Sequence, residues 1–136
     1  MTLLKTPLEQ LVAADEGLRL MPYRCSSGVL TVGYGTAFPL TEHEAHLLLR
    51  HRLQGVLDQC ERRFPWWSKL SPARQQVVAS MGYQLGISGL MGFRRMLAAI
   101  DAGNYRLASD EMLDSKWAIS DSPARARRLA QMMLRG

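Results

Sequence analysis

The stretch Glu16–Thr36, EGLRLMPYRCSSGVLTVGYGT, differs from the rest of the chain and decides the expected fold. Within it, residues 22–35 place β-branched and aromatic side chains on both sides of SSG. This pattern predicts a β-hairpin that turns at residues 26–28. A single hairpin is not stable alone in water, so we expect it to lie against helices.

The remainder of the chain has the pattern of amphipathic helices with clear start signals. Thr6, Pro7 and Glu9 form a capping box with a proline start, and Thr41 begins a second box before a helix that ends at Pro65. Further helices are expected over 72–86 and 92–102, and two more begin at Asn104 and at 122–123. The sequence therefore predicts a mainly helical α+β domain with one hairpin.

Length and composition exclude several classes of protein. The chain has 136 residues, of which 47% are hydrophobic, which suits one domain with one solid core. It has no apolar run long enough to cross a membrane, and its N-terminus lacks the pattern of a secretory signal. With only two cysteines, a cytoplasmic, reduced origin is expected. The formal net charge of +5 favours a polyanionic partner without choosing among nucleic acid, lipid and cell-wall polymer.

The hairpin region carries residue types that suit glycoside hydrolysis. Cleavage of a glycosidic bond needs an acid to protonate the leaving oxygen and a second group to activate water or attack the sugar. Glu16 suits the first role. The hairpin has no Asp or Glu, so Cys25 and Thr31 are the candidates for the second.

The spacing of these three residues resembles the active-site signature of the phage-type lysozymes, glycoside hydrolase family 24. That signature is Glu, eight residues, Asp or Cys, five residues, Thr, and Glu16, Cys25 and Thr31 match both intervals. The resemblance continues in LTEHEA at 40–45, SMGYQLGISGLMGF at 80–93 and SKWAISDSPARARR at 115–128. It therefore covers nearly the whole chain.

This resemblance implies a lysozyme fold with a small β-hairpin lobe and a larger helical lobe. Residues 1–136 would form one lysozyme-like domain. About 16–40 would make the hairpin lobe, 41–65 the connecting helix, and 66–136 together with 1–15 the helical lobe.

The resemblance also implies roles for individual residues. Glu16 would be the general acid, Cys25 would occupy the usual place of an aspartate, and Thr31 would position the attacking water. Tyr83 and Gln84 would line the substrate cleft, and Arg125 would bind beside the catalytic glutamate. Tyr83 and Gln84 alternatively belong to the core of their helix.

The implied activity is that of an endolysin muramidase. It would hydrolyse the β-1,4 bond between N-acetylmuramic acid and N-acetylglucosamine in peptidoglycan, without metal or organic cofactor, and lyse the bacterium. We expect a monomer that accumulates in the host cytoplasm, reaches the wall through a separate holin, and binds no specific nucleic acid.

Cysteine in the place of aspartate leaves two chemical routes open. An ordinary thiol has a pKa of ~8.5, and an ionised Glu16 nearby would raise it, so little thiolate is expected at pH 7. Cys25 would then either shape the site while Thr31 holds the water, or attack the sugar through its small thiolate fraction.

Two other classes of function compete with the enzyme. One is a wall-binding module on a lysozyme scaffold, with Cys25 marking lost chemistry. The other is DNA binding by the basic run ARARR at 124–128. Its alanines and leucine indicate, however, that one face of this helix packs inward. His43, His46 and His51 are expected on a polar helix face, and Cys60 and the three tryptophans (Trp66, Trp67, Trp117) in packed positions.

Overall fold

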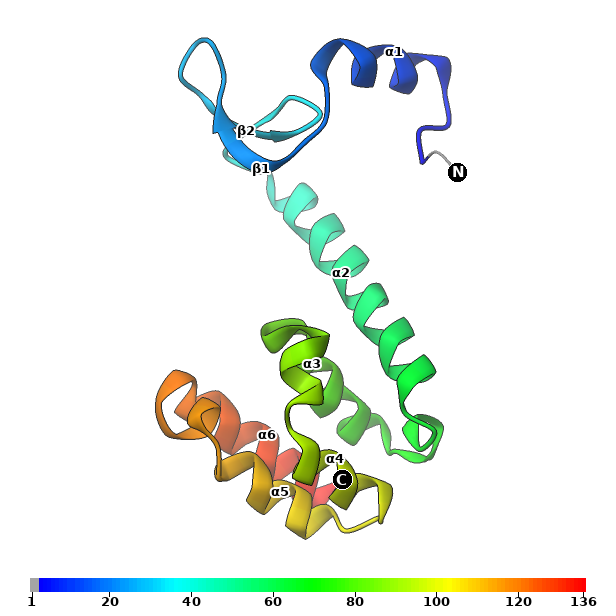
Figure 1. Ribbon diagram of the computed structural model, residues 1–136, viewed down its shortest axis with the longest axis vertical. Helices are drawn as coiled ribbons and strands as arrows, with labels where there is room; N and C mark the ends of the chain where they lie inside the picture. Colours follow the sequence, from blue (N-terminus) through cyan, green and yellow to red (C-terminus); the bar gives the residue numbers. More distant parts are fainter. Residues whose placement is uncertain (1–2) are drawn as a thin grey trace. The chain divides into compact units, whose positions relative to one another are not determined.

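The structure is a computed structural model that describes residues 3–136, and it separates into two compact units, Met1–Leu47 and Leu48–Gly136 (Figure 1). The first unit holds helix α1 and the whole β-sheet, and the second holds the helices that follow α2. The mainly helical α+β prediction is confirmed. The expected assignment of residues 1–15 to the helical lobe stays a prediction.

Helix α1 (Pro7–Glu16) begins and ends where the sequence predicts. The Thr6 hydroxyl accepts a hydrogen bond from the Glu9 N–H at 3.1 Å, and the Glu9 carboxylate accepts one from the Thr6 N–H at 3.0 Å. The Thr6 N–H and, as a smaller cause, the Lys5 N–H donate to the Glu9 carboxylate, and they lower its pKa because they favour the ionised form. The helix stops because Gly17 turns to a positive φ of 74°.

The predicted hairpin is present, and a third strand extends it. Strands β1 (Arg19–Arg24), β2 (Leu30–Gly33) and β3 (Thr36–Ala37) form one antiparallel sheet in the order β1-β2-β3. Thr31 pairs with Tyr23 on one side and with Ala37 on the other. Thr31 therefore lies in the central strand, which explains why only 4% of it is exposed. Two-residue β3 is too short to give a sequence pattern of its own.

Helix α2 (Glu42–Arg63) follows the second capping box. The Thr41 N–H donates to the Glu44 carboxylate at 2.8 Å, and the Glu44 N–H donates to the Thr41 hydroxyl at 3.1 Å. The bond from the Thr41 N–H is the largest cause that lowers the pKa of Glu44. His43, His46 and His51 are exposed on this helix, as predicted. The His46 Nε2 lies 3.9 Å from the Oε1 of Glu42, the residue one helical turn earlier in the chain.

The second unit is built from short helices around one apolar core. They are η1 (Trp67–Lys69), α3 (Pro72–Met91), α4 (Arg94–Asp101), α5 (Tyr105–Leu113), η2 (Trp117–Asp121) and α6 (Pro123–Arg135). Cys60 and the three tryptophans are buried there, which confirms their predicted packing role. Burial also raises the pKa of Cys60 to about 11, because a thiolate would be poorly solvated inside the core.

Two features of these helices differ from the sequence prediction. The helix expected over 72–86 continues to Met91, with a break at Gly86, whose φ of 75° and ψ of 164° are not helical. Residues Trp117–Asp121 form a π-helical turn that no local pattern predicts. Helix α6 begins at Pro123 as expected, and Ala126, Leu129 and Ala130 face the core. The predicted inward face of the basic run is therefore confirmed.

Arg74 connects the start of α3 to the end of α6. Its guanidinium donates to the carbonyl oxygens of Met133 at 2.8 Å and Leu134 at 3.2 Å, which the helix leaves without partners. The same group lies 3.6 Å from the ring centroid of Tyr105 on α5. One side chain thus holds three helices together.

Candidate functional site

The turn between β1 and β2 fixes the backbone of Cys25. The Gly28 N–H donates to the Cys25 carbonyl at 2.8 Å, and the Cys25 N–H donates to the Val29 carbonyl at 2.9 Å. Gly28 has a φ of 83°, the left-handed conformation that closes such a turn and that side chains disfavour. Cys25 is therefore held from both sides at the end of β1.

The sulfur of Cys25 is surrounded by hydrogen-bonding groups. Its Sγ lies 3.1 Å from the Ser27 Oγ. This contact is the largest cause that lowers the pKa of Cys25 to about 7, followed by the backbone N–H groups of Ser27 and Val29, with a smaller contribution from Thr31. The expectation of an ordinary or raised thiol pKa was therefore wrong. Glu16 is not among the groups that shift it, and the lowered pKa makes the thiolate a substantial species near pH 7.

Thr31 is placed beside the Cys25 turn by its position in the central strand. Its hydroxyl donates to the Val29 carbonyl at 2.9 Å. A hydroxyl has one proton to donate and two lone pairs. The Thr31 hydroxyl also contributes to the lowered pKa of Cys25, so its one proton serves either the Val29 carbonyl or the sulfur, and its lone pairs can accept from water. Its predicted role in positioning water stays a prediction.

Glu16 is the last residue of α1, and its carboxyl group lies against Gly35 in the turn between β2 and β3. Gly35 has a φ of 71°, and a methyl group added to it would stand 2.7 Å from the Glu16 Cδ. That distance is too short for two carbon atoms. The absence of a side chain at position 35 thus creates the place that the acid occupies. No pattern in the sequence indicates this contact.

The structure joins the predicted residues of the first unit into two groups. Cys25 lies in the β1–β2 turn and Thr31 in β2 directly after it, whereas the Glu16 carboxyl group lies against Gly35 in the β2–β3 turn. Among residues 3–136 no hydrogen bond links Cys25 to Glu16. The expectation that they face each other across substrate stays a prediction.

Tyr83 and Arg125, in the second unit, line one groove of about 550 Å³. Apolar side chains of α2, Leu49, Leu53 and Leu57, line the same groove. Tyr83 is 41% exposed, which leaves its ring accessible. The Arg125 guanidinium donates to the Ser80 hydroxyl at 2.9 Å, a partner that the sequence did not indicate. The predicted pairing of Arg125 with Glu16 stays a prediction.

Both polar atoms of the Gln84 side-chain amide form hydrogen bonds within the second unit. Its oxygen accepts from the Trp117 indole N–H at 3.0 Å, and its nitrogen donates to the Ser122 hydroxyl at 2.8 Å. These bonds connect α3 to the π-helical turn and to the start of α6. A structural role is therefore shown for Gln84, and a substrate contact stays a prediction.

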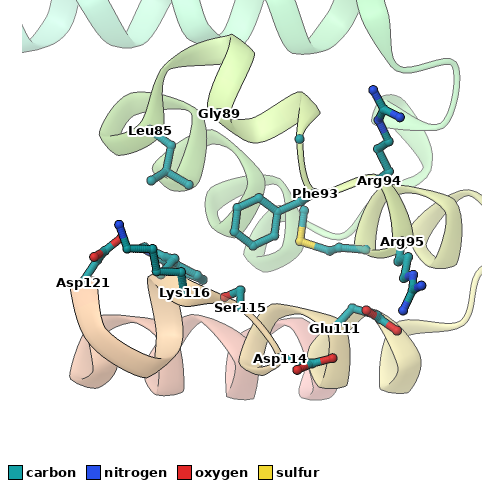
Figure 2. A pocket seen from close by; sticks show the side chains of 13 residues that line it. Leu85, Gly89, Phe93, Arg94, Arg95, Glu111, Asp114, Ser115, Lys116 and Asp121 are labelled. Atoms are coloured by element: carbon teal, nitrogen blue, oxygen red, sulfur yellow. The ribbon is translucent and has the colours of Figure 1, made fainter.

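A separate hollow of about 640 Å³ lies between α3, α5 and η2 (Figure 2). Phe93 points into it and meets Trp117 edge to face, with ring centroids 5.8 Å apart. The rim carries three cations and three carboxylates (Arg94, Arg95, Lys116, Glu111, Asp114, Asp121). None of the predicted site residues lines this hollow. The Glu16, Cys25 and Thr31 group remains the better candidate, because it carries the signature residues and this hollow carries none of them.

Among residues 3–136, no three His, Cys, Asp or Glu side chains are grouped so that they would hold a metal ion. No helix in the same range is both long and apolar enough to cross a membrane.

Comparison with known proteins gives one family and one relative. A family model described as phage lysozyme matches residues 13–131, which include all the candidate site residues. The pre-baseplate central spike protein Gp5 of Enterobacteria phage T4 is 26% identical over 160 aligned positions, covering 95% of this chain and 28% of that protein. The chain thus spans little more than a quarter of the length of this relative.

Proposed function

This chain belongs to the phage lysozyme family of glycoside hydrolases, and from that premise we propose that it hydrolyses peptidoglycan. The bond cut is the β-1,4 linkage between N-acetylmuramic acid and N-acetylglucosamine. The observation that supports the proposal is the match of Glu16, Cys25 and Thr31 to the family signature, inside the region that the family model covers. The Glu16 carboxyl group lies against Gly35, Cys25 lies in the β1–β2 turn, and Thr31 lies in β2 directly after that turn.

In the proposed reaction Glu16 is the general acid. Its carboxyl proton passes to the glycosidic oxygen as the bond from that oxygen to the sugar C1 breaks. The Glu16 side chain is exposed, and its carboxyl group lies against Gly35 at the β2–β3 turn, where no side chain of residue 35 competes for the space.

Cys25 supplies an anionic group to this reaction. With its pKa lowered to about 7, the thiolate is a substantial species at neutral pH. In one route the sulfur attacks C1 as the leaving oxygen departs, and water, losing a proton to the Glu16 carboxylate, then displaces the sulfur. In the other route Cys25 and the Thr31 hydroxyl hold the attacking water. Substitution by serine separates the routes, as described in the Discussion.

The basic character of the chain supports capture of the substrate. Peptidoglycan carries carboxylates on its peptides, and the formal net charge is +5. Tyr83 and Arg125, which line one groove, are the proposed substrate contacts of the helical unit.

Two biological settings are proposed for this activity. As an endolysin, the protein accumulates in the host cytoplasm as a monomer and reaches the wall through a holin at the end of infection. As part of a phage particle, it opens the wall at entry, and the similarity to a central spike protein favours this second setting. Immunoblots distinguish the two settings. The protein should be detected in purified phage particles if it belongs to the particle, and only in the extract of infected cells if it is an endolysin.

A turbidity assay on Gram-negative cells with permeabilised outer membranes tests the proposed activity. The enzyme clears the suspension, whereas a wall-binding module sediments with the cells without clearing them. A DNA-binding protein does neither and retains duplex at physiological salt. Absence of clearing by correctly folded protein would contradict the proposed function.

A further inference from the structure

We propose that Ser27 is a positioning residue for the reaction: its hydroxyl donates a hydrogen bond that holds the sulfur of Cys25 as a thiolate in the catalytic turn. The proposal rests on the proposed function, in which Cys25 supplies the anion. It adds a residue outside the Glu16, Cys25 and Thr31 signature.

The geometry of the turn carries the first step. Ser27 Oγ lies 3.1 Å from Cys25 Sγ, although only one residue separates the two. The turn fixes this approach because Gly28 N–H and Cys25 N–H both bond across it, at 2.8 and 2.9 Å. A hydroxyl held by a closed turn loses less freedom when it bonds the sulfur than one on an open loop would.

The direction of this hydrogen bond depends on the state of the sulfur. A neutral thiol and a hydroxyl can each donate to the other. A thiolate has no proton, so Ser27 must then be the donor, and the bond becomes a charge-assisted one. The contact is therefore stronger in the ionised state, and it shifts Cys25 toward that state.

Other donors complete the surroundings of the sulfur. The backbone N–H groups of Ser27 and Val29 also favour the thiolate. These two donors lie on either side of Gly28, whose own N–H bonds the Cys25 carbonyl instead. A side-chain substitution such as Ser27→Ala leaves these backbone donors in place. The Ser27 hydroxyl is therefore the donor whose effect on the sulfur can be tested by substitution.

The test measures the ionisation of Cys25 directly, through the pH dependence of its alkylation by iodoacetamide. Cys60 does not interfere at neutral pH, because it is fully buried and its pKa is raised to about 11. Cys25→Ala supplies the background rate. Ser27→Ala is compared with Ser27→Thr, which keeps a hydroxyl, and with Ser26→Ala, which changes the neighbouring exposed serine of the same turn.

The expected midpoint is about pH 7 for the parent. For Ser27→Ala it should rise by roughly half a unit or more toward the ~8.5 of an ordinary thiol. Ser27→Thr should restore most of the shift, and Ser26→Ala should match the parent. The whole profile is needed because a more basic thiolate is also more nucleophilic, which offsets part of the rate loss at any one pH. An unchanged midpoint in Ser27→Ala would overturn the proposal.

Lysis of permeabilised cells, measured over the same pH range, tests the link to catalysis. Ser27→Ala should move the rising limb of the lysis profile upward in pH by the same amount as the alkylation midpoint. A shifted midpoint with an unshifted lysis profile would refute the positioning role while leaving the proposed function intact. A parent that alkylates as expected but lyses no cells would refute the proposed function itself.

Discussion

The carboxyl group of Glu16 occupies the space that a side chain would fill at Gly35, where an added methyl group would stand 2.7 Å from the Glu16 Cδ. Gly35 also has a φ of 71°. Two separate physical requirements, a left-handed backbone and a close approach, therefore meet at one residue.

Gly35→Ala should displace the Glu16 carboxyl group and lower lysis by roughly 10²-fold, the scale expected for misplacing a catalytic group by about 1 Å. The matched control is Gly33→Ala. Gly33 has a similar φ of 69°, but nothing lies within 4 Å of its added carbon. Both variants carry the cost of a left-handed alanine, about 1–2 kcal/mol, so only their difference reports on Glu16. Equal lysis rates for the two folded variants would contradict the seating of Glu16 on Gly35.

The role of Cys25 is tested by replacing it with Asp, Ser and Ala. Asp is the residue that the family signature more often has at this position and should retain lysis, whereas Ala removes both nucleophile and polar contact and should lose most of it. Ser keeps a polar contact but is a far weaker nucleophile. Near-parent lysis in Ser with loss in Ala supports water positioning, and loss in both supports attack by sulfur. Full lysis in Cys25→Ala would show that Cys25 only packs.

The lowered pKa of Cys25 predicts how lysis responds to pH. The thiolate is the deprotonated form, so its share falls as pH drops below about 7. Near pH 5 only about 1% remains, which predicts a roughly hundredfold lower contribution of Cys25 than at high pH. An aspartate in the same place titrates near ~3.9 and stays ionised there. Near pH 5 the Cys25→Asp variant should therefore still lyse cells, whereas the parent should not. If the lysis rates of the two proteins depend on pH in the same way, Cys25 does not act as an anion.

Gln84 provides a prediction about stability. Trp117 is only 3% exposed, and its indole N–H depends on the Gln84 oxygen. Gln84→Leu should leave that donor without a partner and lower the free energy of unfolding by about 1–3 kcal/mol. Gln84→Glu keeps an acceptor and should cost less, as measured by denaturant unfolding. If Gln84→Leu is as stable as the parent, the bond to Trp117 contributes nothing to the fold.

Local sequence signals predicted the elements that begin with a cap. Thr6, Thr41 and Asn104 each accept a hydrogen bond from the backbone N–H three residues later, and each begins a helix as expected. Such bonds depend only on neighbouring residues, so the sequence is sufficient to find them. The SSG turn belongs to the same class. The π-helical turn at Trp117 has no such signal, because its bonds to Gln84 depend on a segment 33 residues away.

The candidate site was only partly predictable for the same reason. Spacing and family resemblance identified Glu16, Cys25 and Thr31. The pKa of Cys25 was predicted in the wrong direction, because it depends on donors that converge only when the turn closes around the sulfur. The contact between Gly35 and Glu16 similarly requires two segments separated by β1 and β2. The sequence indicated which residues belong to the site, and the fold determines their ionisation and contacts.

The most direct measurement is product analysis of purified Gram-negative sacculi digested by the parent and by Glu16→Gln. Borohydride reduction followed by mass spectrometry identifies the sugar at each new reducing end. The parent should release soluble muropeptides that end in reduced N-acetylmuramic acid. Glu16→Gln keeps the shape of the side chain but has no proton to transfer, and should release at least about a hundredfold less. Reducing ends on N-acetylglucosamine, or release by folded Glu16→Gln within threefold of the parent, would contradict a muramidase that uses Glu16 as its acid.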